Sequence, residues 1–169
     1  IVTLRRAADG SADEVIEDGV VIVEGNRIVA VGPRAGAGAP VVPPGAKVVD
    51  VAGKTLIPGL VDAHWHGAQG SERLIPEQNW VNLANLAYGV TTIHDPSNDT
   101  NEIFAAAELQ KAGAIVAPRI FSTGTILYGA KGDFKAEIDS LDDALSNLRR
   151  LQAAGARARE RAAAIATLY

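Results

Sequence analysis

The chain has 169 residues, of which 47% are hydrophobic and 21% charged, a balance typical of one globular domain or slightly more rather than of a disordered segment. A formal net charge of −4 argues against a basic surface for nucleic acid or a polybasic membrane patch, and no apolar run is long enough to span a bilayer. Because cysteine is absent, disulfides and thiolate metal ligands are excluded, and a metal would need histidine or oxygen ligands.

The sequence says little about how the natural chain begins or about the compartment in which the protein is located. The chain starts at Ile1, contains no methionine and shows no targeting sequence, so we expect it to be incomplete. A cysteine-free protein is compatible with either redox setting, so the cytoplasm and the periplasm both stay open.

The first 55 residues predict a small β layer without a helix. A short apolar start and a polar loop through Asp18 come first. Two β-branched runs within 19–32 flank the turn at 24–27, which is a strong hairpin signal. A loop rich in glycine, proline and alanine follows, and 47–51 predicts one more strand.

Residues 56–155 predict alternating strands and helices. The strands are expected at 60–66, 90–94 and 119–122, and the helices at 77–88, 101–112 and 140–155. Asp99 with Glu102, and Ser140 with Asp143, have the spacing of capping boxes. The alternation indicates parallel βαβ units with right-handed crossovers, and 124–134 is expected to be a long loop.

Two architectures fit these units. Three units are too few to close an eight-stranded barrel, and they could equally be half of a doubly wound sheet. No Gly-x-Gly-x-x-Gly follows the first strand, so dinucleotide binding has little support. From residue 156 the chain is dense in alanine and arginine, and 156–169 is expected to be a helical tail of uncertain origin.

The stretch 56–67, LIPGLVDAHWHG, contains two of the three histidines. In a strand, His64 and His66 point to the same face and present two imidazoles suited to a divalent metal. Asp62 shares that face and is expected to orient a loop or a histidine. Trp65 has the opposite parity and is expected in the core, and Trp80 is expected to pack its helix on the sheet.

These blocks together resemble the metal-dependent amidohydrolase superfamily, closest to its imidazolonepropionase- and prolidase-like branch. The matching residues are Gly53–Lys54, the run 58–66 and the run 89–92, and the similarity covers about 15 to 155. The resemblance implies a small β-sandwich followed by the first three β/α units of a TIM-type (β/α)8 barrel, left incomplete. It also implies that His64 and His66 bind a divalent metal, zinc above all, at the C-terminal mouth.

The function that the resemblance implies is hydrolysis of a C–N bond in a cyclic amide or a dipeptide by a metal-activated water. His94, Tyr128 and Lys131 are the candidate substrate contacts, because they lie at a strand end or in the long loop expected at this face. The partner is then a small-molecule or dipeptide substrate.

The chain also departs from the family pattern. The superfamily would add two histidines, an aspartate and often a carboxylated lysine from later strands, and no such set follows strand three. The alternative function is therefore a catalytically incomplete module, forming homo-oligomers through its open barrel edges.

Overall fold

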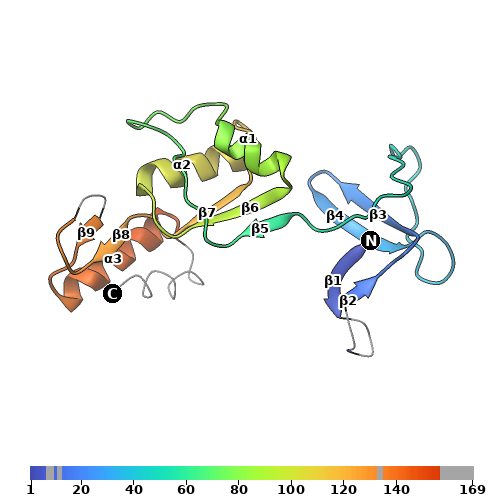
Figure 1. Ribbon diagram of the computed structural model, residues 1–169, viewed down its shortest axis with the longest axis horizontal. Coiled ribbons are helices and arrows are strands. Elements are labelled where there is room, and N and C mark those ends of the chain that lie inside the picture. The colour runs from blue at the N-terminus through green and yellow to red at the C-terminus, as the bar shows by residue number, and fades with distance from the viewer. Residues whose placement is uncertain (7–9, 11–12, 133–134, 157–169) are drawn as a thin grey trace. The chain divides into compact units, whose positions relative to one another are not determined.

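The structure, a computed structural model, describes residues 1–6, 10, 13–132 and 135–156 (Figure 1). The chain divides after Pro58 into two compact units, Ile1–Pro58 and Gly59–Tyr169. The tail predicted at 156–169 lies, from residue 157 on, outside the described residues. Within the described part of the chain, no helix has both the length and the apolar character needed to cross a bilayer.

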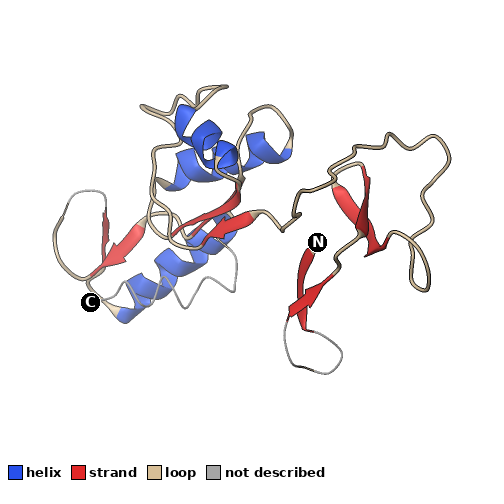
Figure 2. Cartoon of the chain, turned by 45° about the vertical axis from the view of Figure 1, so that its right-hand side comes forward, coloured by secondary structure: helices blue, strands red, loops and turns tan. Residues whose placement is uncertain are grey.

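In the first unit, the described residues form four strands in two small antiparallel sheets (Figure 2). Strands β1 (Val2–Arg6) and β2 (Asp13–Val15) form one pair, and β3 (Gly19–Glu24) and β4 (Arg27–Pro33) form the other. The predicted hairpin is confirmed as β3 and β4. Its turn includes Gly25 at φ +58°, a left-handed conformation that glycine adopts without the steric cost of a Cβ.

Two predictions for this unit were wrong. The segment expected to be a polar loop through Asp18 contains β2, which pairs with β1. The strand expected at 47–51 is not formed, and Val48 and Val49 are 78% and 70% exposed. A β-branched run becomes a strand when a neighbouring strand satisfies its backbone groups, and this run pairs with none among the described residues.

The second unit is built on a three-stranded parallel sheet in the order β5-β6-β7. Its strands and helices are β5 (Leu60–Asp62), α1 (Trp80–Ala87), β6 (Val90–Asp95), α2 (Thr100–Lys111), β7 (Arg119–Ser122) and α3 (Leu141–Ala154). The predicted parallel order is therefore confirmed. Figure 1 shows α1 and α2 against the same face of this sheet, as consecutive right-handed βαβ units place them.

The core of this unit lies between α2 and the sheet. It consists of Trp65, Ile93, Ile103, Ala106, Ile115 and Ile120. Trp65 is in this core as predicted, but Trp80 is 78% exposed, so its predicted packing was wrong. Helix α1 begins at Trp80, three residues later than expected, and its inner face instead carries Asn82, whose buried amide pairs with that of Gln69.

The helix starts follow the predicted capping residues, with one change. The Asp99 carboxylate accepts hydrogen bonds from the backbone N–H groups of Asn101 and Glu102. Glu102 does not complete a capping box, since its Oε1 accepts from the backbone N–H of Arg73 at 3.0 Å. This bond ties the loop after β5 to the start of α2.

The segment expected to be a loop at 124–134 contains a further strand. Strand β8 (Ile126–Tyr128) pairs in parallel with β9 (Lys135–Glu137), in a sheet separate from the first three strands. The flanking glycines favoured a loop in the sequence, but β9 supplies β8 with the backbone partners that a short strand needs.

Candidate metal centre

The two histidines lie just beyond the end of β5, in a segment that is no longer strand. Strand β5 ends at Asp62, so the strand predicted over 60–66 was too long. The reason is local: Asp62 Oδ1 accepts a hydrogen bond from the backbone N–H of His64 at 3.1 Å, which ends the regular ladder. Asp62 therefore orients the backbone that carries the first histidine, the structural role expected for it.

The imidazole rings of His64 and His66 nevertheless come together at the surface. Their centroids are 5.0 Å apart with an interplanar angle of 77°, and both residues are exposed. Two imidazoles bound to one tetrahedral zinc through nitrogens about 2.1 Å from the ion would have centroids roughly 5 Å apart. The spacing of this pair thus fits two ligands of one ion.

A third ligand is not provided by the part of the chain that the structure describes. In those residues, no group of three or more histidine, aspartate, glutamate or cysteine side chains is placed to hold a metal. Catalytic zinc sites ordinarily have three protein ligands. The pair therefore fits a metal as a partial ligand set.

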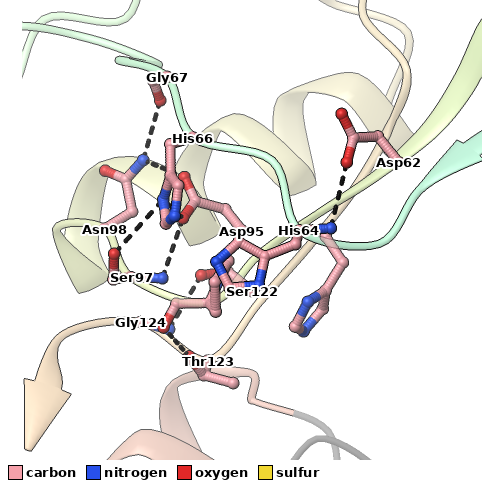
Figure 3. Close-up of polar contacts among 12 residues, drawn as sticks. Asp62, His64, His66, Gly67, Asp95, Ser97, Asn98, Ser122, Thr123 and Gly124 are labelled. Atoms are coloured by element: carbon pink, nitrogen blue, oxygen red, sulfur yellow. Dashed lines mark hydrogen bonds and ion pairs between the residues drawn. The ribbon is translucent and has the colours of Figure 1, made fainter. Parts of the chain in front are cut away.

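Asp95, at the end of β6, is the buried charge of the site (Figure 3). Its side chain is fully buried at the end of β6. Oδ1 accepts from the backbone N–H of Ser97 at 2.9 Å and lies 3.3 Å from Nδ1 of His66. Oδ2 accepts from Nδ2 of Asn98 at 2.7 Å. The sequence signal was a carboxylate directly at the end of a β-branched strand.

A polar network joins the ends of all three parallel strands. Asn98 donates through Nδ2 to the carbonyl of Gly67 after β5, at 2.9 Å, and its backbone N–H donates to the carbonyl of Gly124 after β7, at 3.2 Å. The backbone N–H of Thr123 donates to the carbonyl of Asp95 at 3.2 Å. The segment that carries the histidines is thereby held to β6 and β7.

Gly67 belongs to this arrangement for a steric reason. A Cβ at this position would lie 2.4 Å from the indole ring of Trp65, closer than real Cβ contacts. The absence of a side chain lets the chain turn back over the buried tryptophan directly after His66.

The three predicted substrate contacts lie in different surroundings. His94 is partly buried, with Nδ1 3.3 Å from the carbonyl oxygen of Ala63. The Tyr128 ring is covered by Nζ of Lys135, 3.9 Å from its centroid, and Lys131 is exposed between β8 and β9.

A cavity of about 690 Å³ lies beside the site. Gly67, Ser97 and Asn98 line it at the strand ends, and Ile126 and Lys135 line it from β8 and β9. Lys135, which sequence reasoning did not select, is thus the lysine that lines this cavity.

Comparisons with known proteins agree with this geometry. No protein-family model matches the chain. An imidazolonepropionase of Deinococcus radiodurans is 31% identical over 88% of the chain and 36% of its own length. A dihydroorotase of Geobacter sulfurreducens is 33% identical over 78% of the chain and 30% of its own length.

A solved structure shows the same fold. A prolidase complexed with N-methylphosphonate-L-proline aligns with a TM-score of 0.59 and 24% identity, over 80% of the chain and 39% of its own. The chain thus spans about a third of the length of the curated relatives it matches. With paired histidines at the end of a parallel strand and these similarities, the chain belongs to the amidohydrolase superfamily.

Proposed function

We propose that the chain is part of a metal-dependent hydrolase of C–N bonds, in which His64 and His66 bind a divalent cation, zinc first. The main observation behind this proposal is the pair of imidazole rings, whose centroids lie 5.0 Å apart just beyond the C-terminal end of a parallel strand. Active sites of (β/α)8 enzymes lie at that end of the strands. The relatives are hydrolases that act on C–N bonds, which supports the same reaction class here.

In this proposal the second unit is the first part of an incomplete (β/α)8 barrel, and the first unit is part of a small β-sandwich. The chain's own residues hold the two imidazoles: Asp62 orients the backbone of His64, and Gly67 and Asn98 hold the segment after His66. A bound cation would polarise the scissile carbonyl and lower the pKa of a water molecule. The remaining ligands would come from residues outside the described part of the chain.

The substrate in this proposal is a small cyclic amide or a dipeptide, bound beside the histidines. The cavity next to Ser97 and Asn98 supports this placement, because it offers polar side chains and the Lys135 ammonium within one space. His94, Tyr128 and Lys131 remain the proposed contacts. They lie outside the lining of this cavity, and Lys135, which lines it, contacts the Tyr128 ring through its Nζ.

Zinc binding tests this proposal directly. We expect the purified chain to bind zinc in equilibrium dialysis, and the H64A/H66A double variant to lose at least about 100-fold in affinity, because removing direct ligands costs more than removing their outer partners. The control is His94→Asn, which changes the third histidine and keeps the pair. Undiminished zinc content in the double variant would remove the metal assignment.

A second candidate function is self-association through the sheet edge. Within the described residues β5 pairs only with β6, and its Leu60 and Val61 are 50% and 65% exposed. An exposed apolar edge strand is a template for pairing with another chain. This observation favours a homo-oligomer formed through β5.

Sedimentation velocity tests whether the chain self-associates through the edge strand β5. We expect concentration-dependent dimers or larger species, and we expect the L60K/V61K variant to shift to the monomer, since charge on an edge opposes pairing. Tyr88→Lys is the matched control, because Tyr88 is 84% exposed and lies outside the strands. A wild-type chain that stays monomeric at high micromolar concentration would contradict the candidate.

A further inference from the structure

The ring of His66 makes its polar contacts through one nitrogen. Nδ1 lies 3.3 Å from Oδ1 of Asp95 and 3.4 Å from Oγ of Ser97. Figure 3 shows the ring beside both side chains. A nitrogen that faces the protein is directed away from solvent, so Nε2 is the nitrogen that can meet an external partner.

Asp95 is held so that its carboxylate can act on this ring. It is 0% exposed, and the Ser97 backbone N–H and Asn98 Nδ2 each donate to a different one of its oxygens. A carboxylate has about four lone-pair sites, so two donors leave room for a third. A buried carboxylate is also costly unless it is paired, and Nδ1 of His66, 3.3 Å from Oδ1, lies within ion-pair distance of it.

The two groups near Nδ1 of His66, the Asp95 carboxylate and the Ser97 hydroxyl, differ in whether they require a proton on that nitrogen. An ionised carboxylate only accepts, so Asp95 requires a proton on Nδ1, whereas the Ser97 hydroxyl can accept or donate. Hydrogen bonds to a charged group are roughly twice as strong as neutral ones. The carboxylate therefore decides the tautomer, and the hydroxyl adapts.

We propose that Asp95 is the positioning residue of this site: it holds His66 as the Nδ1–H tautomer and leaves the Nε2 lone pair free for a cation. The arrangement is a carboxylate–histidine pair of the kind that orients metal ligands and raises their basicity. The statement about Nε2 and a cation rests on the proposed function, whereas the statement about the tautomer concerns the metal-free chain alone.

The tautomer is measured directly by long-range ¹H–¹⁵N correlation spectra of the ¹⁵N-labelled, metal-free chain. Spectra at about pH 9 observe neutral imidazole, and single H64Q and H66Q variants assign the signals. We expect His66 to be mainly Nδ1–H. His64 is the internal reference, because in the described part of the chain its ring contacts the His66 ring and no carboxylate. A His66 that is mainly Nε2–H in the wild-type chain overturns the proposal.

Two variants distinguish the effect of Asp95 on the His66 tautomer from that of Ser97. In Asp95→Asn the charged acceptor is lost, so we expect the Nδ1–H population of His66 to fall toward that of His64. In Ser97→Ala the hydroxyl is lost but the backbone N–H to Asp95 stays, so we expect no change. The reverse pattern would assign the tautomer to Ser97 and overturn the proposal. If Asp95→Asn does not fold, the wild-type spectrum still gives the tautomer of His66, and the Ser97→Ala spectrum still shows whether the hydroxyl fixes it.

Zinc titration distinguishes this inference from the proposed function. We expect zinc to perturb Nε2 of His66, and Asp95→Asn to weaken zinc binding about 10–100-fold, the usual effect of losing such a partner. An Nδ1–H tautomer without zinc binding would refute the proposed function and leave the tautomer assignment standing. If the wild-type chain and Asp95→Asn bind zinc equally well, and wild-type His66 is mainly Nε2–H, the role of Asp95 is refuted and the proposed function stands.

Discussion

Replacing Ile103 by alanine is expected to lower the free energy of unfolding by about 2–5 kcal/mol, because a buried isoleucine loses both its transfer free energy and its packing contacts. Ile103 is 0% exposed on α2 and belongs to the core cluster with Ile93, Ile120 and Trp65. The loss is large beside the 5–15 kcal/mol that stabilises an ordinary domain. Urea unfolding followed by Trp65 fluorescence would measure it.

Trp80→Phe is the control and also the reference protein for this measurement. Trp80 is 78% exposed, so this substitution should change stability by no more than about 0.5 kcal/mol. It also leaves Trp65 as the single tryptophan, because the chain has two. A large loss in Trp80→Phe, or none in Ile103→Ala, would contradict the observed packing of α1 and α2 on the sheet.

Replacing Asp95 by alanine is expected to destabilise the second unit by about 2–6 kcal/mol, since two donors are left without their acceptor and each unsatisfied donor costs about 1–3 kcal/mol. These donors are the backbone N–H of Ser97 and Nδ2 of Asn98. Because Asn98 also holds the carbonyl of Gly67, the segment after His66 should loosen as well. The same fluorescence measurement applies, and faster amide exchange at 66–68 would report the loosening.

Asp62→Ala is the matched control for this variant. Asp62 ends a neighbouring parallel strand in the same way, but it is only partly buried, and among the described residues it accepts from the backbone N–H of His64 alone. Its loss should cost about 0.5–1.5 kcal/mol, the usual net value of one hydrogen bond. Equal losses at Asp62 and Asp95 would show that the buried network around Asp95 adds nothing to stability.

The elements that sequence reasoning placed correctly have strong local signals. The hairpin has two β-branched runs around a glycine turn, α2 and α3 begin at capping side chains, and 119–122 stands at the strand position of a regular strand–helix alternation. The elements it placed wrongly depend on partners elsewhere in the chain. The run 47–51 has strand composition but lies unpaired among the described residues, while β8 forms because β9 lies beside it.

The blocks at 53–54, 58–66 and 89–92 together indicated the family, and side-chain parity within LIPGLVDAHWHG predicted the buried tryptophan between the two histidines, because parity and local motif are properties of neighbouring residues. The tertiary structure alone decided which carboxylate faces which histidine. Asp62 is near His66 in sequence but bonds to the backbone of His64, whereas Asp95, on the next strand, reaches Nδ1 of His66. That contact depends on the parallel pairing of β5 with β6, which brings together residues that lie far apart in the sequence.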